Sequence, residues 1–183
     1  MEHFYQNIDG WTKNRYQMFD KVIKSIKPDC LWVEVGAWQG KSVAYCAVEL
    51  INQEKFGKFY AVDSWDGGID LQDYKIVKRG KLKETFLENM KPLGNKIESI
   101  ESLSWDGAQH FDKESIDFCY IDAGHTYDCV KKDLEAWYPK VKKGSYFGGD
   151  DYSYEVKLAV DEFVKKENLE LEEIGACWLL RKP

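Results

Sequence analysis

Acidic side chains stand at the ends of four apolar runs that have the length and composition of buried strands. Glu34 lies in the run CLWVEV, Asp63 ends GKFYAVD, and Asp122 ends SIDFCYID. The pair Asp150-Asp151 follows the run GSYFGG. In parallel α/β sheets, ligands bind at the carboxyl ends of the strands. We therefore expect these carboxylates to contribute to a binding site at that edge of a sheet.

A glycine-containing loop, VGAWQGKS, follows the first of these strands. A phosphate-binding loop has four residues between its first Gly and the Gly-Lys-Ser triplet, and here only Ala37, Trp38 and Gln39 intervene. The dinucleotide pattern GxGxxG is not met either, because Ala37 and Trp38 directly follow Gly36. The loop therefore disfavours both a nucleoside triphosphate and a nicotinamide dinucleotide.

The same loop suits a ligand that carries both an amino group and a carboxylate. Glu34 is placed to meet a positively charged amine, and Gly36 lets the backbone approach a ligand closely. The free N–H groups of the following helix, near Gly40 to Ser42, can bind a carboxylate. Asp63 is placed to accept hydrogen bonds from two ribose hydroxyls, although a helix or turn cap is its alternative role. These features together predict S-adenosylmethionine as the cofactor.

Three of the carboxylates follow neighbouring strands and predict a second ligand. Asp122 ends the fourth strand, and Asp150-Asp151 follow the fifth. Unpaired carboxylates this close repel one another, and a hard divalent cation such as Mg²⁺ or Ca²⁺ removes that conflict. We expect a metal site formed by Asp122, Asp150 and Asp151. The alternative is that Asp150 or Asp151 caps the helix that begins near Tyr154, or pairs with a lysine.

Strands and helices alternate along the chain and must position these side chains. Strands are expected at 30–35, 57–63, 96–102, 115–122 and 144–150, and a terminal pair within 169–183. Apolar residues at helical spacing predict helices at 11–27, 41–53, 82–90, 105–111, 126–138 and 154–167. This alternation predicts an α/β fold with a parallel sheet, helices on both faces and right-handed crossovers. The terminal strands are close enough in sequence to pair antiparallel.

Four stretches in this order resemble class I S-adenosylmethionine-dependent methyltransferases: VEVGAWQGKS, AVDSWDG, SIDFCYIDAGHTYDCVKKDLEAWYPKVKKG and GGDDY. The resemblance runs from about residue 30 to the C-terminus and is closest to the family 24 methyltransferases. It implies a Rossmann-like, three-layer fold whose seven-stranded, mostly parallel sheet has an antiparallel last strand. The cofactor-binding residues that it implies are Glu34, Gly36, Ala37, Trp38, Gly40, Ser42, Asp63, Ser64, Ser104, Trp105 and Asp122. Ser104 and Trp105 would lie near the adenine, their alternative roles being a helix cap and a core aromatic.

The acidic cluster resembles that of catechol-type and macrolide-sugar O-methyltransferases. By position, Asp122, Asp150 and Asp151 match the Mg²⁺ ligands of those enzymes. His125 takes the place of the lysine base of the catechol enzymes, whereas Gly124 stands where the sugar enzymes have an aspartate base. The resemblance therefore implies His125 as the general base beside the catalytic Asp122, and an unperturbed imidazole titrates near pH 6.5, which suits that role. The alternative is a histidine that only orients the Asp122 loop.

The segment 64–94 is longer than an ordinary connection between strands. It resembles the substrate-covering insertion of the sugar-modifying enzymes, in which Trp65 and Tyr74 would close over a ring. Asp66 or Asp70 would bind hydroxyl groups. The alternative is a surface helix with a mobile loop. The N-terminal helix, within 1–28, is short for a catechol-enzyme lid, so we expect a sugar or another polyol as the acceptor.

The composition limits the classes to which this protein can belong. The 183 residues are 44% apolar and 32% charged, which suits a single domain over 1–183 with a real core. A net charge of -6 disfavours a nucleic-acid partner, and no apolar run has the length of a membrane span. Five cysteines without a CxxC pair suit a reducing compartment, so a cytoplasmic protein is expected. The sequence does not determine the oligomeric state, and a homodimer is one alternative.

These observations predict a methyltransferase that transfers a methyl group from S-adenosylmethionine to a small hydroxylated molecule with the help of a divalent cation. Three alternatives remain open. The first is a metal-independent methyltransferase, and the second is a non-catalytic S-adenosylmethionine-binding protein, which Gly124 in place of an acid favours. The third is a nicotinamide-dependent oxidoreductase, which the missing glycine pattern disfavours.

Overall fold

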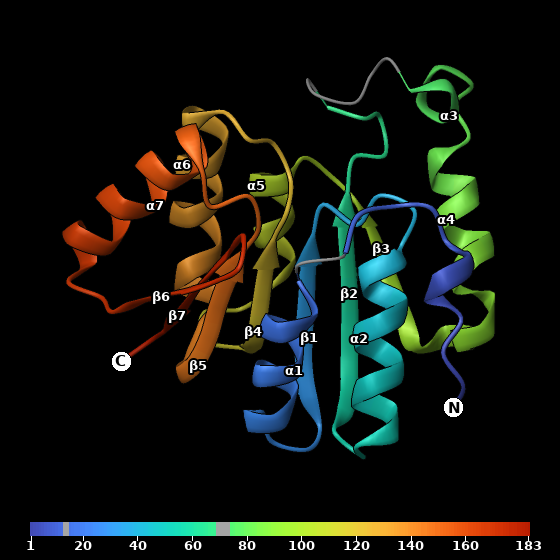
Figure 1. The fold of residues 1–183 in the computed structure, drawn as a ribbon, viewed down its shortest axis with the longest axis horizontal. Coiled ribbons are helices and arrows are strands. Elements are labelled where there is room, and N and C mark those ends of the chain that lie inside the picture. The colour runs from blue at the N-terminus through green and yellow to red at the C-terminus, as the bar shows by residue number, and fades with distance from the viewer. Residues whose placement is uncertain (13–14, 69–73) are drawn as a thin grey trace.

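The computed structural model describes residues 1–12, 15–68 and 74–183. Its sheet has seven strands in the order β3-β2-β1-β4-β5-β7-β6 (Figure 1). The strands are β1 Cys30–Val35, β2 Phe56–Asp63, β3 Ile97–Glu101, β4 Ile116–Ile121, β5 Val141–Gly149, β6 Leu171–Ile174 and β7 Cys177–Arg181. The first five run parallel, and β7 lies antiparallel between β5 and β6. The predicted α/β sheet with an antiparallel last strand is confirmed.

Helices cover both faces of the sheet, which gives the three layers that the sequence predicted (Figure 1). They are α1 Tyr16–Ser25, α2 Lys41–Asn52, α3 Lys75–Lys78, α4 Leu82–Met90, α5 Ser104–Gly107, α6 Tyr127–Trp137 and α7 Tyr154–Glu167. Short 3₁₀ helices occupy Tyr5–Asn7, Lys91–Lys96, Ala108–His110 and Tyr138–Lys140. Among the described residues, none of these helices combines the length and apolar character that crossing a membrane requires.

The two faces have separate cores because successive strand residues point to opposite sides. Helices α1, α2 and α4 pack with Trp32 and Phe118 on one face. Helices α6 and α7 pack with Val33 and Cys119, the neighbouring strand residues, on the other. The apolar spacing that predicted the first helix is confirmed by the buried Met18, Phe19, Val22 and Ile23. This helix begins at Tyr16, however, and not at residue 11.

The strand order reverses between β1 and β4, because the chain winds outward from β1 in both directions. Such a reversal opens a crevice at the carboxyl ends of the two strands. Here the N–H of Asp122 donates to the carbonyl of Val35 at 2.7 Å, and the N–H of Gly36 donates to Val62 at 2.8 Å. These bonds extend β1 pairing past its last residue and place the loops after β1, β2 and β4 side by side.

Candidate active site

A cavity of about 1220 Å³ opens at the carboxyl ends of β1, β2, β4 and β5. It is large for a ligand site, since such pockets usually measure about 300–1000 Å³. The N-terminal segment before α1 forms part of its wall. Among the predicted site residues, those that line it are Gly36, Ala37, Trp38, Ser42, Asp63, Ser64, Ser104, Trp105, Asp122, His125, Asp150 and Asp151. Glu34 and Gly40 are not among the lining residues.

The glycines of the loop after β1 are required by close contacts within the protein. Gly36 has φ +91°, and a Cβ there would lie 1.9 Å from the carbonyl oxygen of Asp122. Gly40 has φ +88° at the N-cap of α2, and a Cβ would lie 2.6 Å from the Met90 side chain. Gly40 uses its N–H in a turn to the carbonyl of Ala37. The sequence predicts that Gly36 allows close approach to a ligand, and the structure shows that it allows close approach to the β4 loop.

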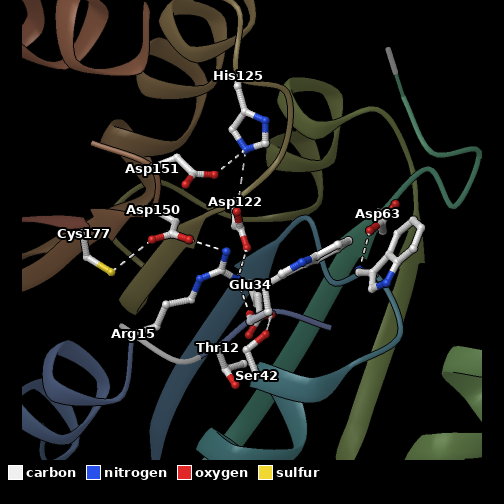
Figure 2. Close-up of polar contacts among 12 residues, drawn as sticks. Thr12, Arg15, Glu34, Ser42, Asp63, Asp122, His125, Asp150, Asp151 and Cys177 are labelled. Atoms are coloured by element: carbon white, nitrogen blue, oxygen red, sulfur yellow. Dashed lines mark hydrogen bonds and ion pairs between the residues drawn. The ribbon is translucent and has the colours of Figure 1, made fainter. Parts of the chain in front are cut away.

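Asp63 is held in place by the backbone of two loops. Its Oδ2 accepts the N–H of Trp38 at 2.8 Å, and its Oδ1 accepts the N–H of Trp65 at 2.7 Å. Burial raises its pKa above the usual range. The lone pairs of the carboxylate that the backbone leaves free can still accept hydroxyl groups of a ligand. The geometry is compatible with the ribose role that we predicted for Asp63 (Figure 2).

Glu34 lies deeper than the sequence indicated. Its side chain is fully buried and accepts a hydrogen bond from the hydroxyl of Ser42, which does line the cavity. Burial raises the pKa of Glu34 to about 8, so its carboxyl group is mostly protonated at neutral pH. The structure therefore does not bring Glu34 to the cavity wall as an ionised partner for an amine. Its contact with Ser42 fixes the start of α2 instead.

We expect Glu34→Gln to change stability in a pH-dependent way. The pKa of about 8 in the folded state exceeds the ordinary 4.5, so the folded protein favours the neutral acid. The wild type should therefore lose stability relative to the variant as pH rises from 4.5 to 8, by about 4 kcal/mol. Urea unfolding at pH 4.5, 7 and 9 measures this difference. The exposed Glu167, changed to Gln, is the control and should show no such trend.

The carboxylates after β4 and β5 meet an arginine that sequence reasoning missed. Arg15 Nη1 donates to Asp122 Oδ2 at 2.6 Å, and Nη2 forms an ion pair with Asp150 Oδ2 (Figure 2). Cys177 Sγ lies 3.3 Å from the other oxygen of Asp150. The sequence leaves a lysine open as the alternative partner of Asp150 or Asp151. No local pattern marks Arg15, because it lies 107 residues from Asp122 in the chain.

His125 lies between the carboxylates of Asp122 and Asp151. Its Nε2 lies 3.1 Å from Asp151 Oδ2 and 3.9 Å from Asp122 Oδ1. The carboxylates of Asp122 and Asp151 raise the pKa of His125 to about 10. At neutral pH the imidazole thus keeps its proton, so it can donate a hydrogen bond but is a poor general base in this arrangement. The base role predicted for His125 needs its neutral form.

The predicted metal site of three carboxylates does not fit this arrangement. Ligand atoms of Asp122, His125 and Asp151 lie within 4.8 Å of one another, and an imidazole thus stands where a carboxylate was expected. Asp150, the third predicted ligand, is turned to Arg15 and Cys177. Mg²⁺ prefers an all-oxygen environment with most of its water retained. The sequence indicated that the carboxylates need a positive charge, but it did not indicate its source.

Two further predicted residues, Ser104 and Trp105, come from the loop after β3 and the start of α5. Ser104 begins α5, and its carbonyl accepts the indole N–H of Trp137 at 2.9 Å. Lys132 Nζ lies 4.6 Å from the ring centre of Trp105. Both Ser104 and Trp105 line the cavity, and their place beside an adenine stays a prediction.

The segment 64–94 departs from the prediction at Trp65. Trp65 is 6% exposed and packs on Phe86, so its ring belongs to the core and is not placed to close over an acceptor. Asp66 lines the cavity. Tyr74 is exposed and lies 5.9 Å, between ring centres, from Trp11 of the N-terminal segment. Asp70 lies outside the described residues.

The seven-stranded fold is that of a class I methyltransferase. The sequence model of a methyltransferase domain, family 24, matches residues 33–152, more than half of the chain. The chain therefore belongs to this family of S-adenosylmethionine-dependent methyltransferases. No curated protein sequence matches it.

Solved structures share this fold at low sequence identity. The O-methyltransferase NovP is 20% identical with a TM-score of 0.66, over 92% of this chain and 79% of NovP. CalS11, a TDP-rhamnose 3'-O-methyltransferase of calicheamicin biosynthesis, is 16% identical with a TM-score of 0.63, over 91% and 80%. SMU.1697c from Streptococcus mutans, determined with S-adenosylhomocysteine, is 13% identical with a TM-score of 0.66, over 93% and 98%. At these identities the likeness establishes the fold.

Proposed function

We propose that this protein transfers the methyl group of S-adenosylmethionine to a hydroxyl oxygen of a small acceptor such as a sugar, polyol or catechol. The observation that carries the proposal is one cavity whose wall combines residues of two kinds. Gly36 and Asp63, from the loops after β1 and β2, line it together with the charged Arg15, His125 and Asp151. The family supplies the methyl-transfer chemistry. NovP and CalS11, which share the fold, are O-methyltransferases.

In this proposal, the loop after β1 and Asp63 hold the methionine and ribose, and Ser104 and Trp105 flank the adenine. The acceptor enters beside the charged residues after β4 and β5. The protein's contribution is then proximity and alignment of the acceptor oxygen with the sulfonium methyl group. His125 keeps its Nε2 proton directed at Asp151 and so positions that carboxylate beside the acceptor. As the oxygen–methyl bond forms, the carbon–sulfur bond of the cofactor breaks, and the hydroxyl proton is released to water in the cavity. No step in this scheme requires a metal ion.

The pH dependence of methyl transfer separates the two roles of His125. If the neutral imidazole is the base, kcat/KM should rise with pH up to about 10, the pKa that the two carboxylates impose. If His125 acts as a hydrogen-bond donor, kcat/KM should be flat from pH 7 to 9 and fall towards pH 10. We expect the second profile. A rise of about tenfold per pH unit across this range would restore the general-base role.

The first test of the proposed function is titration calorimetry with S-adenosylhomocysteine, followed by an assay of labelled methyl transfer to sugars, polyols and catechols. We expect saturable binding and transfer to at least one class of acceptor. Binding without transfer to any acceptor would favour the non-catalytic alternative. Binding of NAD without S-adenosylhomocysteine would overturn the proposal.

A further inference from the structure

The carboxylates of Asp122 and Asp150 form a negatively charged pair with little access to water. Their side chains are 13% and 4% exposed. Two carboxylates in such surroundings need a cation, because neither can be left unpaired away from water. In the structure, the Arg15 side chain, itself 12% exposed, bridges the two (Figure 2). The cation that the cluster requires is thus already part of the chain.

Arg15 is fixed by the backbone as well as by its two acidic partners. It occupies the N-cap position of α1, and Nη1 also donates to the carbonyl of Trp11 at 2.7 Å. Helix α1 is anchored on the sheet by Phe19, whose ring centre lies 4.9 Å from that of Tyr120 on β4. The guanidinium therefore reaches the carboxylates from an element that packs against the same strand. It also connects them to the N-terminal segment that lines the cavity.

A divalent ion would have to displace this guanidinium to use the same oxygens. Arginine stays protonated in proteins, so the displaced side chain would remain charged and lose both partners. Asp122 would keep only Oδ1 for a metal, and Asp150 Oδ1 faces Cys177. The neighbouring donors are His125 Nε2 and Asp151 Oδ2, and the imidazole suits neither Mg²⁺ nor Ca²⁺.

We propose that Arg15 is the resident cation of the Asp122–Asp150 pair and keeps divalent metal ions off it. Arg15 is a positioning residue here: it holds the ends of β4 and β5 together and fixes the N-terminal wall of the cavity. Methyl transfer then proceeds without a metal on these two carboxylates. That last consequence rests on the proposed function, whereas exclusion of the metal does not.

Mn²⁺ binding, followed by electron paramagnetic resonance, tests the exclusion. Wild type should bind Mn²⁺ weakly, and Arg15→Gln should bind it about tenfold more tightly or better, because the two carboxylates are then uncompensated. Adding Asp150→Asn to Arg15→Gln should abolish the gain. Lys21→Gln is the matched control, because it removes one positive charge from the same helix at a surface pair with Glu172. It should leave Mn²⁺ binding as in wild type.

Two outcomes would overturn the proposal. One is tight Mn²⁺ binding by wild type that Asp150→Asn abolishes, which would mean that Arg15 yields to the metal. The other is a folded Arg15→Gln variant that gains no Mn²⁺ binding. If Arg15→Gln does not fold, the comparison of Mn²⁺ binding between wild type and Asp150→Asn decides whether Arg15 yields to the metal.

Titration of the same wild-type sample with S-adenosylhomocysteine in the presence and absence of EDTA separates this proposal from the proposed function. Failure to bind the cofactor product would count against the function, while the Mn²⁺ comparison would still decide the role of Arg15. Methyl transfer that EDTA stops and Mn²⁺ restores would refute metal-free turnover. We expect transfer to be unchanged by EDTA.

Discussion

Asp63→Ala should weaken the binding of S-adenosylhomocysteine by about 100-fold or more. A carboxylate that accepts hydrogen bonds from two ribose hydroxyls contributes about 1.5–3 kcal/mol for each bond, and tenfold in affinity corresponds to about 1.4 kcal/mol. The change also releases the N–H groups of Trp38 and Trp65, which Asp63 holds at 2.8 and 2.7 Å. Both the direct contact and the shape of the two loops are then lost. Calorimetry measures the affinity directly.

Two variants show whether the loss comes from the ribose contact. Asp63→Asn keeps an oxygen acceptor but not the charge, so its affinity should fall between those of wild type and Asp63→Ala. Asp117→Ala is the matched control: Asp117 also accepts a backbone N–H, that of Leu31 at 2.9 Å, but near the opposite end of β1 and β4. It should affect stability and leave the dissociation constant unchanged. Unchanged binding by Asp63→Ala would refute the ribose assignment.

The features that could be predicted from sequence are those with a local physical cause. Apolar runs bounded by glycine and acidic residues predicted the strands, and helical spacing predicted the buried face of α1. The edge of the sheet that carries the site followed from parallel strand order alone. For this reason Asp63, Asp122 and His125 line one cavity, although long stretches of chain separate them.

The features that could not be predicted depend on contacts between distant parts of the chain. The bridge from Arg15 to Asp122 and Asp150 depends on the point at which α1 begins, and the predicted helix began earlier. The depth of Glu34 depends on how α2 packs over β1, because Ser42 stands between Glu34 and the cavity. Trp65 belongs to the core because α4 presents Phe86 to it. In each case the type of residue indicated that it mattered, but no local pattern in the sequence indicated the residue that it contacts.

The contact between the β1 and β4 loops makes Gly36 the position least tolerant of a side chain among those discussed. In Gly36→Ala the new methyl group would lie 1.9 Å from the carbonyl oxygen of Asp122 and 2.4 Å from its carbonyl carbon. Both are backbone atoms, so no side chain can rotate away, and the two loops must separate. We expect a loss of about 4 kcal/mol or more in the free energy of unfolding, together with loss of S-adenosylhomocysteine binding.

Gly144→Ala separates this steric effect from the cost of the backbone conformation. Gly144 has φ +76°, close to the +91° of Gly36, but a Cβ at position 144 would meet no atom within 4 Å. The free energy of unfolding of Gly144→Ala should fall by only about 1–2 kcal/mol, which is the cost of placing alanine in the left-handed region. Urea unfolding of both variants gives the difference. Equal losses in the free energy of unfolding would show that the loops after β1 and β4 can separate at little energetic cost. The close approach at Gly36 would then not hold Asp122 at the cavity wall.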